Sequence, residues 1–354
     1  MSIIIFILIL AVLILVHEFG HYITAKKNGI LVEEFGFGYP PRLFSIKIRD
    51  TVYSINLIPL GGFVKVYGEE YHEKINPKLK KMSFSSKKPH QKALVLVAGV
   101  IGNFILGWVL ISYLFTQGVP TPTNKVIIEQ IQKSSPAETV GIKPNDIVIK
   151  VMDNTGKSYL VKSSDEFISF TKKNLDKPII LEIDRQGQTI KKTLVPRSKY
   201  PTGQGPLGVI ISSFIEKRFP WYQAPFYGLV EAFNITYKIV VELLKTIFQF
   251  VTLQKPKAEV AGPIGIAYYT SQVIKFGNNA VLELMALLSL NLAVVQLLPF
   301  PALDGGRLAF VIYEWVTKKK VNQNFEKYLN LIGFVLLITL AIVISVNDII
   351  RIYK

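Results

Sequence analysis

Cysteine is absent from the 354 residues of the chain. This absence excludes a disulfide framework, and it restricts any metal site to ligands from histidine, aspartate and glutamate. Acidic residues are scarce beside basic ones, 25 against 41, so the chain carries a net charge of +16. A balance this basic is typical of proteins that meet nucleic acid or an anionic membrane surface.

Half of the residues are hydrophobic and the mean hydropathy is +0.35, which is high for a soluble protein of this length. A membrane-spanning helix needs about 20 mostly apolar residues, and four stretches reach that length. They predict a polytopic α-helical membrane protein with spans at 1–25, 93–117, 281–300 and 329–348. Basic loops beside spans then explain the charge, and we expect no nucleic-acid partner.

No lysine or arginine precedes Lys26, and no small-residue cleavage site follows the first apolar stretch. A cleaved signal peptide needs both, so we expect a retained anchor whose N-terminus lies outside. Residues 26–92 hold 13 basic and 6 acidic residues, and residues 318–320 are three lysines after the third span. The positive-inside rule predicts that both loops are cytoplasmic, which leaves residues 118–280 on the extracytoplasmic side.

Two of these loops contain predicted structure of their own. Residues 118–200 are more charged and alternate apolar with polar positions, which predicts a small α+β domain. In the region 201–280, an apolar stretch at about 226–253 carries charges at helical spacing, which favours an amphipathic helix on the membrane surface. Extended runs at about 43–66 surround a glycine pair and predict a membrane-associated β-hairpin or small sheet.

His17, Glu18 and His21 interrupt the first apolar stretch with H-E-x-x-H spacing. On a helix this spacing places both imidazoles on one face, where they can bind one zinc ion. The glutamate then lies close enough to accept a proton from the attacking water. The alternative is a coincidental polar patch, but each ionisable group in an apolar helix costs about 3 kcal/mol without a partner. The other histidines, His72 and His90, lie in a polar loop, where we expect them to be solvated.

A catalytic zinc site usually takes a third protein ligand and leaves one position open. The candidate is Asp304, in LLPFPALDGGR just after the third predicted span. The prolines before it break the helix, and the two glycines after it permit a tight turn. The aspartate could instead cap the N-terminus of the next helix, and the two roles are compatible.

Three of the amide side chains inside the predicted spans are candidates for a role in the site or in helix packing. For Gln296, which is near Asp304, we favour contact with a substrate or with the developing oxyanion. Asn291 could bind substrate or join helices, and a contact between helices is favoured. Asn103, beside the small residues of AGVIGN, is assigned to close helix packing.

The sequence resembles the bacterial site-2 protease family of the RseP type, which are intramembrane zinc metalloproteases, nearly from end to end. The resemblance is carried by VHEFGHYITAKKNGI, FGFGYPPRLF, INLIPLGGFVKVYGE, SSPAETVGIKPNDIVIKV, AGPIGI and NLAVVQLLPFPALDGGR. It implies one zinc ion bound by His17, His21 and Asp304, with Glu18 as the catalytic base.

The resemblance also implies partners and compartments. The 43–66 element resembles a membrane-associated β-element that holds the substrate as an added strand, here through Gly61, Gly62, Phe63 and Val64. Residues 118–200 resemble a PDZ domain that can take a peptide ligand. We expect a bacterial inner-membrane protease with its active site towards the cytoplasm and its PDZ domain outside. Its expected substrates are single-span membrane proteins, such as anti-sigma factors and remnant signal peptides, cut within or near the span.

Three departures from the family pattern are visible. Gln296 stands where the family usually has asparagine, and the chain has room for one PDZ domain where many members have two. The KPGD turn reads KPND, in which Asn145 tolerates a left-handed backbone. Two other functions stay open: a PDZ-containing scaffold with a degenerate metal site, and a transporter with an ion path of buried polar groups. Intact metal ligands argue against the first, and charges confined to two spans argue against the second.

Overall fold

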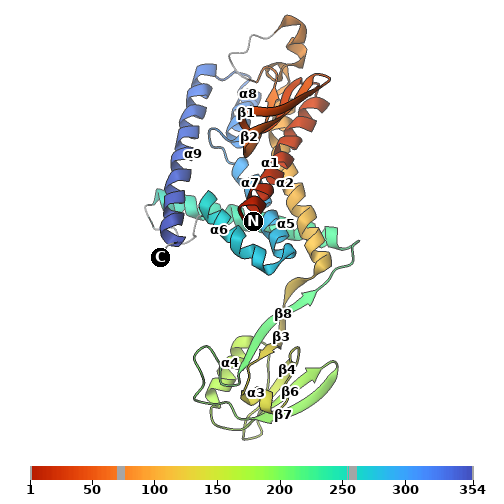
Figure 1. Ribbon diagram of the computed structural model, residues 1–354, viewed down its shortest axis with the longest axis vertical. Coiled ribbons are helices and arrows are strands. Elements are labelled where there is room, and N and C mark those ends of the chain that lie inside the picture. Colours follow the sequence, from red (N-terminus) through yellow and green to blue (C-terminus); the bar gives the residue numbers. More distant parts are fainter. Residues whose placement is uncertain (1, 70–75, 253, 255–260, 353–354) are drawn as a thin grey trace. The chain divides into compact units, whose positions relative to one another are not determined.

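The computed structural model describes residues 2–69, 76–252, 254 and 261–352. They form two compact units, of which one combines Met1–Thr116 with Pro220–Lys354 and the other is Gln117–Phe219. The first unit is mostly helical and the second is built around a sheet (Figure 1). The division separates the helices of spanning length from the α+β domain that the sequence predicts.

Four helices of the first unit are long and apolar enough to cross a membrane: α1 (Ser2–Lys27), α2 (Pro89–Gln117), α7 (Asn278–Gln296) and α9 (Gln323–Ile352). They overlap the four predicted spans, which are confirmed by length and composition. α1 is apolar on every side rather than along one stripe, as expected of a helix surrounded by lipid and other apolar helices. α9 leaves large apolar side chains exposed along most of its length, a surface that lipid would cover.

Shorter helices join these four. α5 (Ala224–Val251) overlaps the expected amphipathic helix at 226–253, and its placement on a membrane surface stays a prediction. One side of α5 packs Ala232 into a core cluster with residues of α2 and α7, namely Ile111, Ala286 and Leu290. The remaining short elements are α6 (Pro263–Val273), α8 (Asp304–Thr317) and the 3-10 turns Pro77–Met82, Phe84–Ser86 and Ile274–Phe276.

A long hairpin of β1 (Val32–Ile48) and β2 (Thr51–Val66) packs against α1 (Figure 1). Its strands fold over each other, because residues 34–37 of β1 pair with two different parts of β2. The resulting lateral order of strand segments is 42–48, 51–56, 32–37 and 62–66. The last segment lies at an edge, and its outer side pairs with no strand in the described part of the chain. The sequence predicted the sheet from residue 43 onward and missed its central segment.

The second unit is an antiparallel sheet with two helices. Its strands run in the order β7-β6-β4-β3-β8, and a short strand β5 pairs with β4. The bounds are β3 (Val119–Ile131), α3 (Pro136–Thr139), β4 (Ile147–Met152), β5 (Ser158–Leu160), α4 (Ser164–Lys173), β6 (Ile179–Arg185), β7 (Gln188–Leu194) and β8 (Val209–Lys217). The predicted α+β domain is therefore present, while its identity as a PDZ domain stays a prediction.

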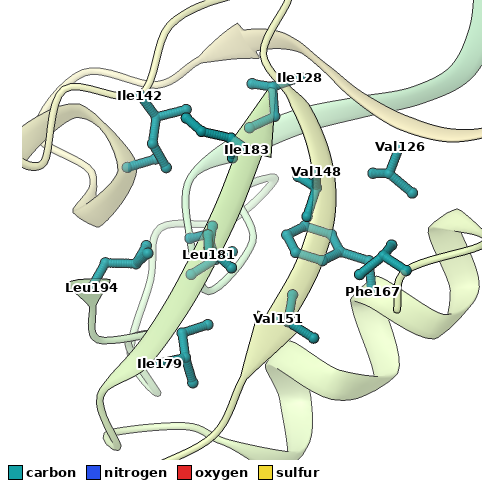
Figure 2. Packing of buried hydrophobic residues seen from close by; sticks show 13 residues of the cluster. Val126, Ile128, Ile142, Val148, Val151, Phe167, Ile179, Leu181, Ile183 and Leu194 are labelled. Carbon is teal, nitrogen blue, oxygen red and sulfur yellow. The ribbon is translucent and has the colours of Figure 1, made fainter. Parts of the chain in front are cut away.

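One apolar core holds this unit together. Figure 2 shows Phe167 of α4 beside Val148 of the sheet, with Leu181 and Ile183 farther along the same core. The predicted boundary at residue 200 is too early, because β8 pairs with β3 along most of its length and the unit extends to Phe219. The glycine- and proline-containing stretch before β8 concealed the strand, whose pairing partners lie 78 to 98 residues earlier in the chain.

An ion pair between the buried Asp146 and the partly exposed Arg185 fixes the start of β4 to the end of β6. Both Asp146 oxygens accept from Arg185 at 2.7 Å, and one also accepts from the Lys143 N–H at 2.8 Å. Burial alone would raise the pKa of Asp146, but these partners hold it below its ordinary value. A depressed folded-state pKa stabilises the fold above the ordinary pKa, and this stabilisation is lost as pH falls through the depressed value.

We therefore expect Asp146→Asn to destabilise the second unit by about 1–3 kcal/mol at neutral pH, because Arg185 loses a charged partner. The difference from the unsubstituted protein should shrink below about pH 4, where the Asp146 carboxyl of the unfolded chain starts to be protonated while that of the folded chain is still ionised. Hydrogen exchange of the β4 and β6 amides in the full chain measures the opening free energy. Glu129→Gln, at an exposed position of β3, is the matched control. An equal effect of both substitutions would contradict the role given to the ion pair.

Candidate metal centre

Two histidines face the same way from the middle of α1. His17 and His21 are four residues apart, about one helical turn, and both are largely buried. Their Nε2 atoms lie 3.1 Å from each other. Glu18 follows His17 in the sequence and is half-buried. It lines the same cavity as the two histidines. The predicted geometry of the H-E-x-x-H segment is thus present on a helix of spanning length.

The chain returns to α1 through the turn between α7 and α8. α7 ends at Gln296, and α8 begins at Asp304 after a bend in which Ala302 has a φ of 71°. A Cβ on Gly305 would lie 2.3 Å from the Leu297 carbonyl oxygen. Glycine is therefore required for the bend to fold this tightly and to aim Asp304 at α1. The helix cap is Leu303, so capping is not the role of Asp304.

Asp304 meets both histidines with one carboxylate oxygen. Its Oδ2 lies 3.0 Å from His17 Nε2 and 3.1 Å from His21 Nε2. Burial alone would raise the pKa of the Asp304 carboxyl, but the two imidazoles hold it well below its usual range. The carboxyl is thus ionised at neutral pH, as a metal ligand must be.

These three side chains fit a zinc ion by donor type and by spacing. Ligands at about 2.0–2.1 Å from a tetrahedral zinc lie about 3.3 Å from one another, close to the three separations observed. Two imidazoles and one carboxylate form a catalytic zinc set that leaves a fourth position open. The described residues contain one such group of three ligands, His17, His21 and Asp304.

α2 supplies the outer contacts of the two histidines, and the sequence did not reveal this role. His21 Nδ1 donates to the Val95 carbonyl oxygen at 2.8 Å. A Cβ on Gly99 would lie 2.5 Å from His21 Nε2, so only glycine lets α2 approach this closely. Asn103, which was assigned to packing alone, lies with its amide 3.4 Å from His17 Nδ1. Spacing was the available signal, since 95, 99 and 103 share one helix face.

A cavity of about 740 Å³ opens on the metal centre. One wall is the edge segment 62–66 of β2, and other walls come from α7, α8 and α9. The segment passes close to the predicted base, because a Cβ on Gly62 would lie 3.3 Å from Glu18 Cγ. An ion pair between Glu69 and Arg307 ties the end of β2 to α8 beside the same cavity.

Four of the six predicted substrate-binding residues line the cavity and two do not. Gln296, Gly62, Phe63 and Val64 line the cavity. Gly61 instead packs on the ring of Tyr39. Asn291 is exposed on α7 and is absent from the cavity wall. Of the two loop histidines, His90 is exposed, and His72 lies outside the described residues.

Sequence comparison agrees with this geometry. The profile of peptidase family M50 matches residues 5–340. The chain belongs to peptidase family M50. It is 34% identical to a predicted zinc metalloprotease of Clostridium perfringens over 99% of both chains. It is 28% identical to the regulator of sigma-W protease RasP of Bacillus subtilis, and to the zinc metalloprotease RasP of Oceanobacillus iheyensis, again over 99% of each chain.

Membership of family M50 identifies the enzyme as a zinc metalloprotease of the site-2 type. The resemblance recognised in the sequence is confirmed, and so is the class of enzyme. The scaffold and transporter alternatives lose their basis, because the chain belongs to a protease family and His17, His21 and Asp304 converge where they could hold one metal ion.

Proposed function

We propose that this M50 protease is an intramembrane endopeptidase that uses one zinc ion to cut single-span membrane proteins within or near their spans. One observation carries the proposal: Asp304 meets His17 and His21 of α1, a helix of spanning length, and the cavity beside them is walled by segment 62–66 at the edge of the sheet. A water-soluble protease has no need to bury its metal ligands in such a helix, where ionisable groups are costly.

In this proposal, each residue of the centre has one task. His17, His21 and Asp304 would hold a zinc ion, which would supply Lewis acidity and lower the pKa of the attacking water towards neutrality. Glu18 accepts the proton of the attacking water and passes it to the leaving amine. Gln296 donates from the cavity wall to the substrate carbonyl as negative charge develops there.

Segment 62–66 of β2 receives the substrate as an added strand in this proposal. A peptide bond inside a helix is shielded, so the substrate must be extended before it is cut, and a sheet edge provides hydrogen bonds for an extended chain. Phe63 and Val64 then contact its side chains, while Gly62 lets the strand pass beside Glu18. The exposed position of Asn291 gives that residue no part in this binding.

The substrates and compartments are also proposals. The printed name of the Bacillus subtilis relative refers to sigma-W regulation, which supports anti-sigma factors as substrates, and remnant signal peptides have the same single-span form. We place the protein in the bacterial plasma membrane with the metal centre towards the cytoplasm, where the basic loops lie. The unit 117–219 is placed outside as a PDZ-like domain that docks peptides or excludes bulky substrates.

Cleavage of a defined substrate tests the proposal. The zinc-loaded protein in lipid nanodiscs should cut a tagged single-span protein, and mass spectrometry of the products should locate the cut within or near the span. A chelator should stop the reaction, and added zinc should restore it. A water-soluble peptide of equal length without an apolar stretch is the control. Cutting of the soluble peptide alone, or cuts far from the span, would contradict intramembrane proteolysis.

A further inference from the structure

One face of α2 follows the two histidines of α1 closely. Val95, Gly99 and Asn103 recur every four residues and therefore lie on one side of the helix. A Cβ on Gly99 would lie 2.5 Å from His21 Nε2 and 2.8 Å from His17 Nδ1. Because residue 99 has no side chain, the Val95 carbonyl can reach the His21 ring and the Asn103 amide can reach the His17 ring.

His21 shows what a metal-binding histidine needs from this face. Its Nδ1–H donates to the Val95 carbonyl oxygen at 2.8 Å, so the lone pair is left on Nε2. That Nε2 atom is the one that points at Asp304. A histidine ligand commonly has an acceptor for its second nitrogen, which fixes both the tautomer and the ring orientation.

Among the described residues, one side chain is placed to accept a hydrogen bond from the second ring nitrogen of His17. The Nε2 atom of His17 also points at Asp304, so its Nδ1 must carry the proton when Nε2 binds a metal. The amide of Asn103 lies 3.4 Å from that Nδ1. Asn103 is completely buried, and its Oδ1 has no hydrogen-bond partner among the described residues. A half-turn of the amide exchanges its oxygen and nitrogen, which would bring Oδ1 to the Nδ1–H of His17.

We propose that Asn103 is a positioning residue for the zinc site: its Oδ1 accepts the Nδ1–H of His17 and holds Nε2 towards the metal. The backbone of Asn103 is fixed independently, because Ser289 Oγ on α7 donates to its carbonyl oxygen at 2.7 Å. The Asn103 side chain therefore extends towards His17 from a backbone position that is fixed by α2 itself and by the hydrogen bond from α7. The proposal rests on the metal centre and is independent of which substrate is cut.

The test compares two substitutions of similar size at this position. Asn103→Leu removes the acceptor, and zinc affinity should fall by about 10- to 100-fold, the usual effect of losing an outer partner of a ligand. Asn103→Asp keeps an acceptor oxygen and should bind zinc nearly as tightly as the unsubstituted protein. Affinity is measured on the full chain in detergent by competition with a chelator of known zinc affinity, so the result is independent of proteolysis.

A packing role would give a different pattern. Thermal unfolding of the zinc-free proteins reports packing, and Ser289→Ala loosens the same helix contact without touching the amide. We expect Asn103→Leu to keep its zinc-free unfolding temperature and Ser289→Ala to keep its zinc affinity. The proposal is overturned if Asn103→Leu binds zinc normally, or if Asn103→Asp and Ser289→Ala lose affinity as strongly as Asn103→Leu does.

Discussion

Replacing Glu18 by glutamine is expected to abolish cleavage of a single-span substrate while zinc stays bound. Glutamine has nearly the same size and cannot accept the proton of the attacking water. General base catalysis contributes roughly 10²- to 10⁴-fold to enzymatic rates, so kcat should fall by at least about 100-fold. The zinc content should be unchanged, because the converging ligand atoms belong to His17, His21 and Asp304. Single-turnover cleavage checks the loss of rate, and metal analysis of the same preparation checks that the zinc content is unchanged.

The matched control for Glu18→Gln is the same chemical change in another spanning helix. Glu283 is exposed on α7 and does not line the cavity, so Glu283→Gln should cleave at the normal rate. Loss of zinc from Glu18→Gln would show that the glutamate also holds the metal. Cleavage by Glu18→Gln at the normal rate would remove Glu18 from the mechanism, and a different base in the cavity would then be needed.

The parts of this site that the sequence predicts are those with local spacing. His17 and His21 face one way because helical geometry alone decides it, and Asp304 is recognisable because prolines and glycines surround an acidic residue just after an apolar stretch. The four spans are equally local, since composition over about 20 residues determines them. Where local geometry decides, the structure agrees with the sequence.

The parts that the sequence does not predict depend on which distant segments meet. Residues 34–37 of β1 pair with two parts of β2 at once, and no local pattern specifies such an arrangement. The strand β8 belongs to the second unit only through its pairing with β3. Asn103 illustrates the same limit, because a polar residue in an apolar helix reveals that it has a partner but does not reveal which one.

Replacing Asp304 by asparagine should remove zinc from the enzyme. The amide is the same size but carries no charge, and it is a poor substitute for an ionised oxygen that two imidazole Nε2 atoms share at 3.0 and 3.1 Å. Loss of an outer-shell partner already costs roughly 10- to 100-fold in metal affinity, so loss of a direct ligand should exceed about 100-fold. Chelator competition measures the affinity, and the rise in unfolding temperature on zinc addition should disappear with it.

Asp348 provides the control for Asp304→Asn, since it is a buried carboxylate whose hydrogen-bond partners are backbone N–H groups away from the metal centre. Its Oδ2 accepts from the backbone N–H groups of Gly262 and Gly265, at 2.9 and 2.7 Å, and so holds the start of α6 against α9. Asp348→Asn should lower the unfolding temperature and leave zinc affinity intact, because it weakens a helix contact outside the metal centre. If instead Asp304→Asn kept its zinc while Asp348→Asn lost it, the third ligand would not be Asp304, and the contact of Asp304 with His17 and His21 would be structural.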